Sequence, residues 1–261
     1  MNDLLLKVND LTVTVHEGGR PRNIIESVGF EVPKLGIVAL VGGSGSGKTT
    51  TGLAILRLLQ PALSITGGEI LFEGSDLLRL SADEMRRLRG ASISMVFQEP
   101  LDAFNPVFSI GYQINEVLTF HTQLNNKQKR ERLYELLDLV GLPEPKQIAK
   151  NYPHQLSGGM RQRAMIAQAI AANPKLMIAD EPTSNLDVTL QAKIMELFQK
   201  LRNELNLSVL LITHDLGMVE HMADHVVVMK AGSIVESDTT QAIVEKPKHE
   251  YTRQLIKAFQ V

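Results

Sequence analysis

The stretch that decides the fold is Gly36-Ile-Val-Ala-Leu-Val-Gly-Gly-Ser-Gly-Ser-Gly-Lys-Thr-Thr50. Its first part is a short apolar run of strand length, and its second part fits the pattern G-x-x-x-x-G-K-[ST] from Gly42 to Thr49. A helical pattern follows, predicted to run from Thr49 to Leu59 and to stop at Gln60-Pro61. A buried strand, a glycine-rich loop and a helix in this order are typical of a loop whose backbone N–H groups converge on phosphate.

The residues expected to bind nucleotide phosphates are Gly42, Gly43, Ser44, Gly45, Ser46, Gly47, Lys48, Thr49 and Thr50. Lys48 supplies a positive charge toward the β- and γ-phosphates, and the Thr49 hydroxyl can ligate Mg²⁺. ATP and Mg²⁺ are therefore the predicted cofactors. The alternative is a flexible Gly-Ser linker, but a linker would not lie between a strand and a helix.

A phosphate-binding loop needs a carboxylate to complete its metal site. An apolar strand that begins at Leu176 ends in Asp180, and Glu181 follows at once. Asp180 is expected to hold Mg²⁺, largely through water, and Glu181 to orient or deprotonate the attacking water. Taken alone, Asp-Glu-Pro after a strand is more often a turn. The phosphate-binding loop upstream favours the catalytic interpretation.

Composition sets limits on the class of protein. Among 261 residues, 27 basic and 29 acidic side chains give a net charge of −2, so the electropositive surface that nucleic acid usually requires is not indicated. The absence of cysteine excludes a disulfide framework, a zinc ribbon and cysteine-ligated iron–sulfur clusters. The N-terminal apolar run is too short for a signal peptide, and no apolar run reaches the ~18 residues of a membrane-spanning helix. Any membrane role is therefore expected to go through a partner.

The remaining pattern predicts an α/β fold. Strand signals fill residues 4–41, with a turn at 18–21, and return at 68–72 and 92–97, with a capping box at Ser81 between them. Helical patterns replace them from 109 to 141 and predict an all-helical insert, in which a helix at 126–140 has one apolar face. Strands and helices then alternate, which implies a parallel sheet. The predicted elements are a helix to Ala172, strand 176–180, helix 188–205, strand 208–213, strands 225–229 and 233–236, and a helical tail 241–259 broken at Pro247.

Further motifs separate this chain from other phosphate-loop proteins. Leu156-Ser-Gly-Gly-Met160 opens a helix, where Ser157, Gly158 and Gly159 form a second anion cradle. Gln98, the segment Ser184-Asn-Leu-Asp187 and His214 occur in the order and spacing of the Q-loop, D-loop and switch histidine of ABC ATPases. The chain therefore resembles the ATP-hydrolysing subunits of ABC transporters.

This resemblance implies a P-loop NTPase fold with an N-terminal antiparallel β subdomain and an inserted helical subdomain. The whole chain, 1–261, is then one nucleotide-binding domain, with an ATPase core at 1–98 and 155–240, a helical subdomain at 99–154 and a helical tail at 241–261. The implied dimer is head-to-tail, with each ATP between one subunit's phosphate loop and the other's signature motif. By the same resemblance Lys48, Glu181 and His214 are catalytic, Gln98 contacts Mg²⁺ and senses the permease, and Asp187 couples the two sites.

Within this family the chain is similar to the peptide and nickel importer group. The resembling segments are Gln98-Glu-Pro100, Phe104-Asn-Pro-Val107, Ile110-Gly-Tyr-Gln113, Tyr152 to Gly159 and Pro247-Lys-His-Glu-Tyr-Thr252. The short tail without cysteine and Gly43, where peptide relatives commonly have Glu, favour nickel or a metallophore as cargo over di- or oligopeptides. The implied partners are two integral-membrane permease subunits, a second homologous ATPase subunit, with a homodimer as the alternative, and indirectly an extracytoplasmic solute-binding protein. The implied location is the cytoplasmic face of the inner membrane.

One departure and two rival functions remain. ABC ATPases usually stack adenine on an aromatic residue, whereas the candidate positions here are Val15 and His16. A first rival is a non-transport ABC ATPase acting on DNA or ribosomes, but its usual coiled coils, zinc modules or doubled ATPase units are not found here. A second rival is a nucleotide-binding regulator without hydrolysis, against which Glu181 and His214 argue, because binding alone needs neither.

Overall fold

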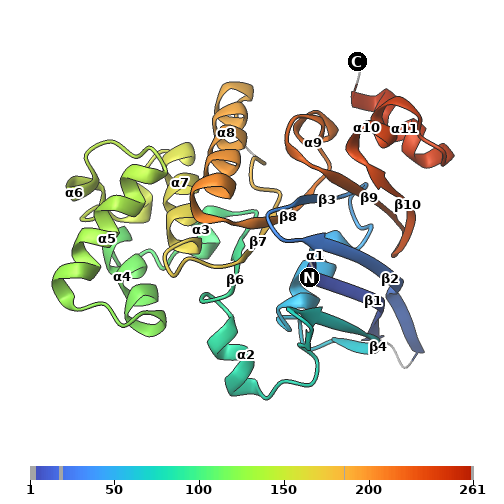
Figure 1. Ribbon diagram of the computed structural model, residues 1–261, viewed down its shortest axis with the longest axis horizontal. Helices are drawn as coiled ribbons and strands as arrows, with labels where there is room; N and C mark the ends of the chain where they lie inside the picture. Colours follow the sequence, from blue (N-terminus) through green and yellow to red (C-terminus); the bar gives the residue numbers. More distant parts are fainter. Residues whose placement is uncertain (1–3, 18–19, 185, 260–261) are drawn as a thin grey trace. The chain divides into compact units, whose positions relative to one another are not determined.

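The computed structural model describes residues 4–17, 20–184 and 186–259 and divides into two compact units (Figure 1). Unit 1 comprises the chain up to Met85 and from Leu207 onward, and unit 2 comprises Arg86–Asn206. The predicted α/β class is confirmed in both units. The predicted boundaries of the ATPase core, helical subdomain and tail stay predictions.

Unit 1 contains an antiparallel sheet in the order β2-β1-β4-β5. Its strands are β1 (Leu4–Glu17), β2 (Arg20–Pro33), β4 (Leu63–Phe72) and β5 (Ser75–Asp76). Alternation in β1 buries Leu11 and Val13 completely and leaves Thr12 half-buried between them, as expected for a sheet with one face in the core. The predicted turn at 18–21 lies partly outside the described residues.

The second sheet of unit 1 positions the phosphate loop. The parallel strand β8 (Ser208–Thr213) lies on one side of β3 (Ile37–Val41), the parallel strand β9 (His225–Lys230) lies on its other side, and β10 (Ser233–Thr239) is antiparallel to β9. Every residue of β3 and β8 is buried, the pattern of parallel strands covered on both faces. The helices of this unit are α1 (Lys48–Ile55), α9 (Leu216–Met222), α10 (Thr240–Glu245) and α11 (Glu250–Phe259).

Unit 2 combines a parallel strand pair with a group of helices. The pair is β6 (Ile93–Val96) and β7 (Leu176–Asp180). The helices are α3 (Pro100–Ala103), α4 (Ile110–His121), α5 (Asn126–Leu139), α6 (Pro145–Ile148), the short 3₁₀ helix η1 (Pro153–Gln155), α7 (Gly158–Ala169) and α8 (Val188–Leu205). The apolar face predicted for α5 is confirmed, because Leu133, Leu136, Leu137 and Val140 are all buried.

The helix α2 (Ala82–Leu88) lies where the chain passes from unit 1 to unit 2. Its predicted capping box is confirmed, since the Ser81 N–H donates to Glu84 Oε2 at 2.8 Å and the Glu84 N–H donates to Ser81 Oγ at 3.3 Å. Across the described ranges, no helix combines the length and the apolar character that crossing a membrane requires.

Two helices end earlier than predicted. α1 stops at Ile55 instead of Leu59, because Arg57 adopts the left-handed conformation, with φ of 52°. The Arg57 guanidinium donates to the carbonyls of Leu77 and Leu80, which fixes this exit from the helix. α7 stops at Ala169 instead of Ala172, and the chain turns at Asn173, with φ of 54°.

Candidate nucleotide-binding and catalytic residues

The phosphate loop connects β3 to α1 in unit 1. Gly47 has φ of 104° at the N-cap of α1, a conformation that a side chain would strain. The side chain of Lys48 folds back over the loop, where its Nζ donates to the carbonyl oxygens of Gly42 at 2.8 Å and Gly43 at 3.1 Å. Lys48 is only 7 % exposed, so its positive charge is directed at the loop instead of bulk water.

Two further observations show that this loop fits an anionic group. A Cβ added at Gly42 would lie 2.2 Å from the carbonyl oxygen of Met229, so only glycine allows the close approach of these two backbones. Ser46 Oγ is buried and, within the described part of the chain, has no hydrogen-bond partner. A buried hydroxyl without a partner costs free energy unless a ligand atom or water satisfies it. These residues therefore fit a phosphate.

The turn between β9 and β10 braces the loop. The Gly232 N–H donates to the carbonyl of Ser46 at 3.0 Å, and the Gly232 carbonyl accepts the N–H of Glu26 in β2 at 2.9 Å. A Cβ at Gly232 would meet the Ile24 carbonyl oxygen at 2.5 Å, so this turn also depends on glycine. The phosphate loop is thus held by backbone contacts with both sheets of unit 1.

His214 emerges beside the phosphate loop. Val41 of β3 pairs in register with Thr213 of β8, so Gly42 and His214 both follow the carboxyl ends of neighbouring parallel strands. His214 is exposed, and the next residue, Asp215, caps α9 by accepting the Met218 N–H at 3.1 Å. The structure therefore brings two of the predicted motifs to one edge of a sheet.

The predicted acidic pair lies at the corresponding edge in unit 2. Val96 of β6 pairs with Ala179 of β7, so Asp180, the last residue of β7, and Gln98, two residues after β6, lie at the carboxyl ends of adjacent strands. Asp180 is 2 % exposed, whereas Glu181 is half-buried and has a left-handed φ of 46°. Such strained backbone is found preferentially at functional sites. The Ser184 hydroxyl contacts the carbonyls of Glu181 at 2.9 Å and Gln98 at 3.4 Å and so ties the two segments together.

The signature motif begins α7. Ser157 Oγ accepts the Met160 N–H at 3.4 Å, and a Cβ at the exposed Gly158 would meet nothing within 4 Å. Gly159 is buried against α8, because a Cβ there would lie 3.2 Å from Leu190 Cδ1. Asp187 caps α8 by accepting the Leu190 N–H at 2.9 Å, while Asn185 of the same motif lies outside the described residues. The signature and D-loop motifs thus start two packed helices.

The predicted residues for adenine lie on β1. Val15 is half-buried and pairs with Arg22 of β2 and Leu63 of β4, and the exposed His16 ring contacts Ser64 Oγ through Nε2 at 2.9 Å. Within the described ranges, no three His, Cys, Asp or Glu side chains form a group able to hold a metal ion. Asp180, Thr49 and Gln98 carry the carboxylate, hydroxyl and amide oxygens that could hold a Mg²⁺ ion, which commonly completes its shell with water and phosphate oxygens.

Sequence reasoning missed one contact of the phosphate loop. The Gly43 N–H donates to Tyr251 Oη at 2.8 Å. Tyr251 lies in the Pro247–Thr252 segment, which served the sequence interpretation only as a family marker. No local pattern could predict a contact between residues 208 positions apart.

Comparison with known proteins places these motifs in context. The family model described as "ABC transporter" matches residues 25–184. The peptidoglycan transport ATP-binding protein YejF of Agrobacterium fabrum is 49 % identical over 255 residues, which cover 97 % of this chain but only 47 % of YejF. The oligopeptide transport ATP-binding protein OppD of Bacillus subtilis is 47 % identical, over 97 % of this chain and 71 % of OppD.

Among solved structures, the ATP-binding cassette MJ0796, in a dimer bound to ADP and phosphate, superposes with a TM-score of 0.81. It is 29 % identical, and the match covers 90 % of this chain and 99 % of MJ0796. The predicted fold is therefore confirmed at the level of the whole ATPase cassette.

Proposed function

Because this chain belongs to the ABC transporter family and is an ATP-binding ATPase of that family, we propose that it energises a membrane importer of peptides. The proposal is supported by relatives named for oligopeptide and peptidoglycan transport at 47 and 49 % identity. A nickel or metallophore cargo, which Gly43 favours, stays an alternative. The observation that carries the ATPase function is the phosphate loop, with Lys48 buried over it and a buried Ser46 hydroxyl that has no hydrogen-bond partner among the described residues.

Each predicted residue is assigned a role by its chemistry. Bound ATP supplies a γ-phosphoryl group that can be transferred to water. The loop N–H groups and Lys48 bind the phosphates, and His214 donates a hydrogen bond to the γ-phosphate. Thr49, Asp180 and Gln98 provide oxygen atoms suited to Mg²⁺. Glu181 orients the attacking water and accepts its proton.

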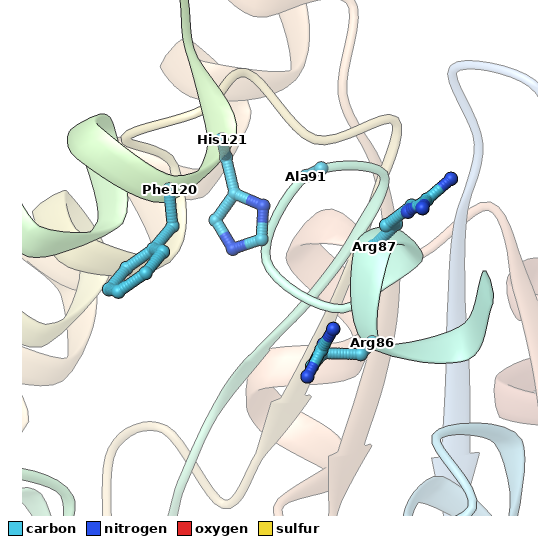
Figure 2. Close-up of a pocket in the computed structure, with 5 residues that line it drawn as sticks. All are labelled: Arg86, Arg87, Ala91, Phe120 and His121. Atoms are coloured by element: carbon cyan, nitrogen blue, oxygen red, sulfur yellow. The ribbon is translucent and has the colours of Figure 1, made fainter. Parts of the chain in front are cut away.

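Unit 2 also has a pocket that suits a segment of the permease (Figure 2). Its volume is about 740 Å³, and it is lined by Arg86, Arg87, Ala91, Phe120 and His121. Phe120 and His121 lie at the end of α4, and the Phe120 side chain is 75 % exposed, which is unusual for a large aromatic residue. The His121 ring packs against the loop, since a Cβ at Gly90 would meet its Nε2 at 2.8 Å.

The charge and apolar character of the residues that line this pocket indicate which kind of permease segment it binds. Two arginines on one side favour a carboxylate, and Phe120 with Ala91 favours small apolar side chains beside it. Burial lowers the pKa of His121, so this residue is neutral at physiological pH and the positive charge comes from the arginines. We therefore assign the pocket to a permease segment that combines one acidic residue with small apolar residues.

This docking site is tested by charge reversal. Arg87→Glu should abolish copurification with the permease pair encoded beside the ATPase gene, and Phe120→Ala should weaken it, because each removes one part of the complementarity. Arg130→Glu, on the exposed face of α5, is the matched control and should copurify normally. Copurification of Arg87→Glu at the wild-type level would exclude the pocket as the docking site.

The import function is tested with the complete transporter in proteoliposomes. Wild type should take up a labelled oligopeptide when ATP is enclosed on the ATPase side, and a Glu181→Gln transporter should not. Uptake of labelled nickel or a nickel chelate, without uptake of peptide, would replace the peptide proposal by the metal alternative. ATP hydrolysis without transport of either solute would contradict both.

A further inference from the structure

The phosphate loop donates a hydrogen bond to a side chain near the other end of the chain. Tyr251, in the first turn of α11, accepts the Gly43 N–H on its phenolic oxygen at 2.8 Å. This helix packs against α9 within unit 1 (Figure 1). Gly43 is the second residue of the loop, so the tyrosine contacts the backbone that approaches the phosphates.

Gly43 is held from both sides. Its carbonyl accepts Lys48 Nζ at 3.1 Å and the Ser46 N–H at 3.3 Å, while its N–H is fixed by Tyr251. The orientation of Gly43 therefore sets the position of the carbonyl oxygen that accepts a hydrogen bond from the Lys48 ammonium. The fit is tight, because a Cβ at Gly43 would lie 3.1 Å from Tyr251 Oη.

Tyr251 is itself rigidly supported. Lys230 Nζ at the end of β9 lies 4.9 Å from the centre of its ring, within the range of a cation–π contact. The Tyr251 N–H donates to His249 Nδ1 at 3.1 Å, and the Glu236 carboxylate of β10 accepts the N–H groups of Lys248 and His249 at 2.7 and 3.0 Å. The hydroxyl is thus presented by a segment whose backbone is anchored to the sheet.

A tyrosine that served only to attach α11 would place its hydroxyl on any available acceptor or donor of the core. This hydroxyl instead meets a loop N–H that lies five residues before Lys48 in the sequence. A loop that is held in its binding conformation loses less entropy when the ligand binds. The contact therefore bears on nucleotide affinity more than on the stability of the fold.

We propose that Tyr251 is a positioning residue of the nucleotide site, which orders Gly43 and through it Lys48 for phosphate binding. The inference rests on the proposed function, because it takes residues 42–49 as the phosphate-binding loop. It gives the Pro247–Thr252 segment a role in the ATPase reaction in addition to its role in packing.

The first test is Tyr251→Phe, which removes only the hydroxyl, with Tyr134→Phe on α5 as the matched control. The dissociation constants of ATP and ADP are measured by titration with a fluorescent nucleotide, together with KM, kcat and the melting temperature without nucleotide. We expect Tyr251→Phe to raise the dissociation constants and KM about three- to tenfold, as for the loss of one hydrogen bond, with kcat at saturation little changed. Tyr134→Phe should match wild type.

A double-mutant cycle separates positioning from simple packing. Gly43→Ala crowds the Tyr251 hydroxyl and should weaken nucleotide binding in the wild-type background, but it should add little once Tyr251→Phe has removed that hydroxyl. Additive effects of the two substitutions, or a lower melting temperature of Tyr251→Phe with unchanged affinity, would overturn the inference. Lys48→Ala separates a failure of the loop assignment from a failure of the role of Tyr251. If Lys48→Ala binds nucleotide as well as wild type does, the assignment of the phosphate-binding loop is wrong. If Lys48→Ala binds nucleotide weakly and Tyr251→Phe binds it normally, only the role of Tyr251 is rejected.

Discussion

Glu181 is the residue at which binding and chemistry can be separated most cleanly. Glu181→Gln keeps the size of the side chain and leaves the phosphate loop in unit 1 unchanged, but it removes the carboxylate that we propose accepts a proton from water. We expect nucleotide affinity near wild type and a kcat at least about 100-fold lower, since a general base contributes roughly 10²–10⁴ to a rate.

The comparison with Lys48→Ala makes this prediction specific. Lys48→Ala should mainly weaken nucleotide binding, because it removes the ammonium that lies over the loop. Equilibrium titration should therefore show weakened nucleotide binding for Lys48→Ala and normal binding for Glu181→Gln, whereas steady-state hydrolysis at saturating ATP should be slowed mainly in Glu181→Gln. Turnover of Glu181→Gln near the wild-type rate would contradict the catalytic assignment.

Val15 lies at a position where the family resemblance predicts an aromatic residue that stacks on adenine. It is half-buried on β1, and the neighbouring His16 ring is held by Ser64, so neither position presents a free aromatic ring. Val15→Tyr should tighten ATP binding by roughly 1–3 kcal/mol if this position faces adenine, the range found for base–aromatic stacking. Titrations of wild type and Val15→Tyr with ATP and with GTP measure the gain in affinity and the preference for adenine. Unchanged affinity for both nucleotides would place adenine elsewhere.

At the scale of elements, the attachment of the C-terminal segment to β10 depends on one carboxylate. Partial burial opposes ionisation of Glu236, but the Thr252 side chain, the hydrogen bonds from the Lys248 and His249 N–H groups and the charge of Lys248 outweigh it and lower the pKa. A lowered pKa in the folded state means that this stabilisation is complete above the ordinary value of 4.5 and is lost as the pH falls below it.

Glu236→Gln should therefore lower stability by about 1–3 kcal/mol near neutral pH, because it weakens hydrogen bonds to a charged acceptor. The difference from wild type should shrink as the pH falls below 4.5, where the wild-type carboxylate becomes protonated. Thermal unfolding across pH 3–7 measures it, with the exposed Glu245→Gln on α10 as the control. A difference that does not change with pH would mean that the charge of Glu236 has no role.

Elements with strong local signals could be predicted from the sequence, and others could not. The bounds of α8 and β8 agree with prediction, because Asp187 caps the helix and Asn206, in the left-handed conformation, ends it. The short helix α9 was missed, since seven residues give too little periodicity. The predicted end of α1 was wrong because the left-handed Arg57, whose side chain donates to the Leu77 and Leu80 carbonyls, turns the chain early. The predicted end of α7 was three residues late, since Ile170 already leaves the helix.

In the candidate site, too, the features with strong local sequence signals could be predicted and the others could not. The phosphate loop, the acidic pair and the signature motif are contiguous in sequence, so their residue types and neighbours indicate their chemistry directly. The Gly43–Tyr251 contact and the bracing of Ser46 by Gly232 depend on which strands lie side by side, and this is settled only in the folded chain. Sequence therefore predicts the chemical groups of the site better than the supports that position them.

At the scale of the whole molecule, one chain carries every motif of the ATPase, including a signature helix with an exposed N-terminus at Ser157 and Gly158. Two identical copies could therefore form two competent sites by symmetry. MJ0796, to which the chain is similar, was itself solved as a dimer bound to ADP and phosphate. Family resemblance favours a pair of different ATPase chains, one of them encoded by a neighbouring gene.

We expect the purified chain to be mostly monomeric with slow turnover, and the heterodimer to be the working form. The physical reason is that permease subunits hold two ATPase chains at high effective concentration, so the free chains need little affinity for each other. Light scattering of the Glu181→Gln protein measures the mass with and without ATP, alone and mixed with the neighbour-encoded ATPase. ATP should raise the mass to that of a dimer mainly in the mixture. A tight ATP-dependent homodimer that does not exchange with the second chain would show instead that two copies of this chain form the working pair.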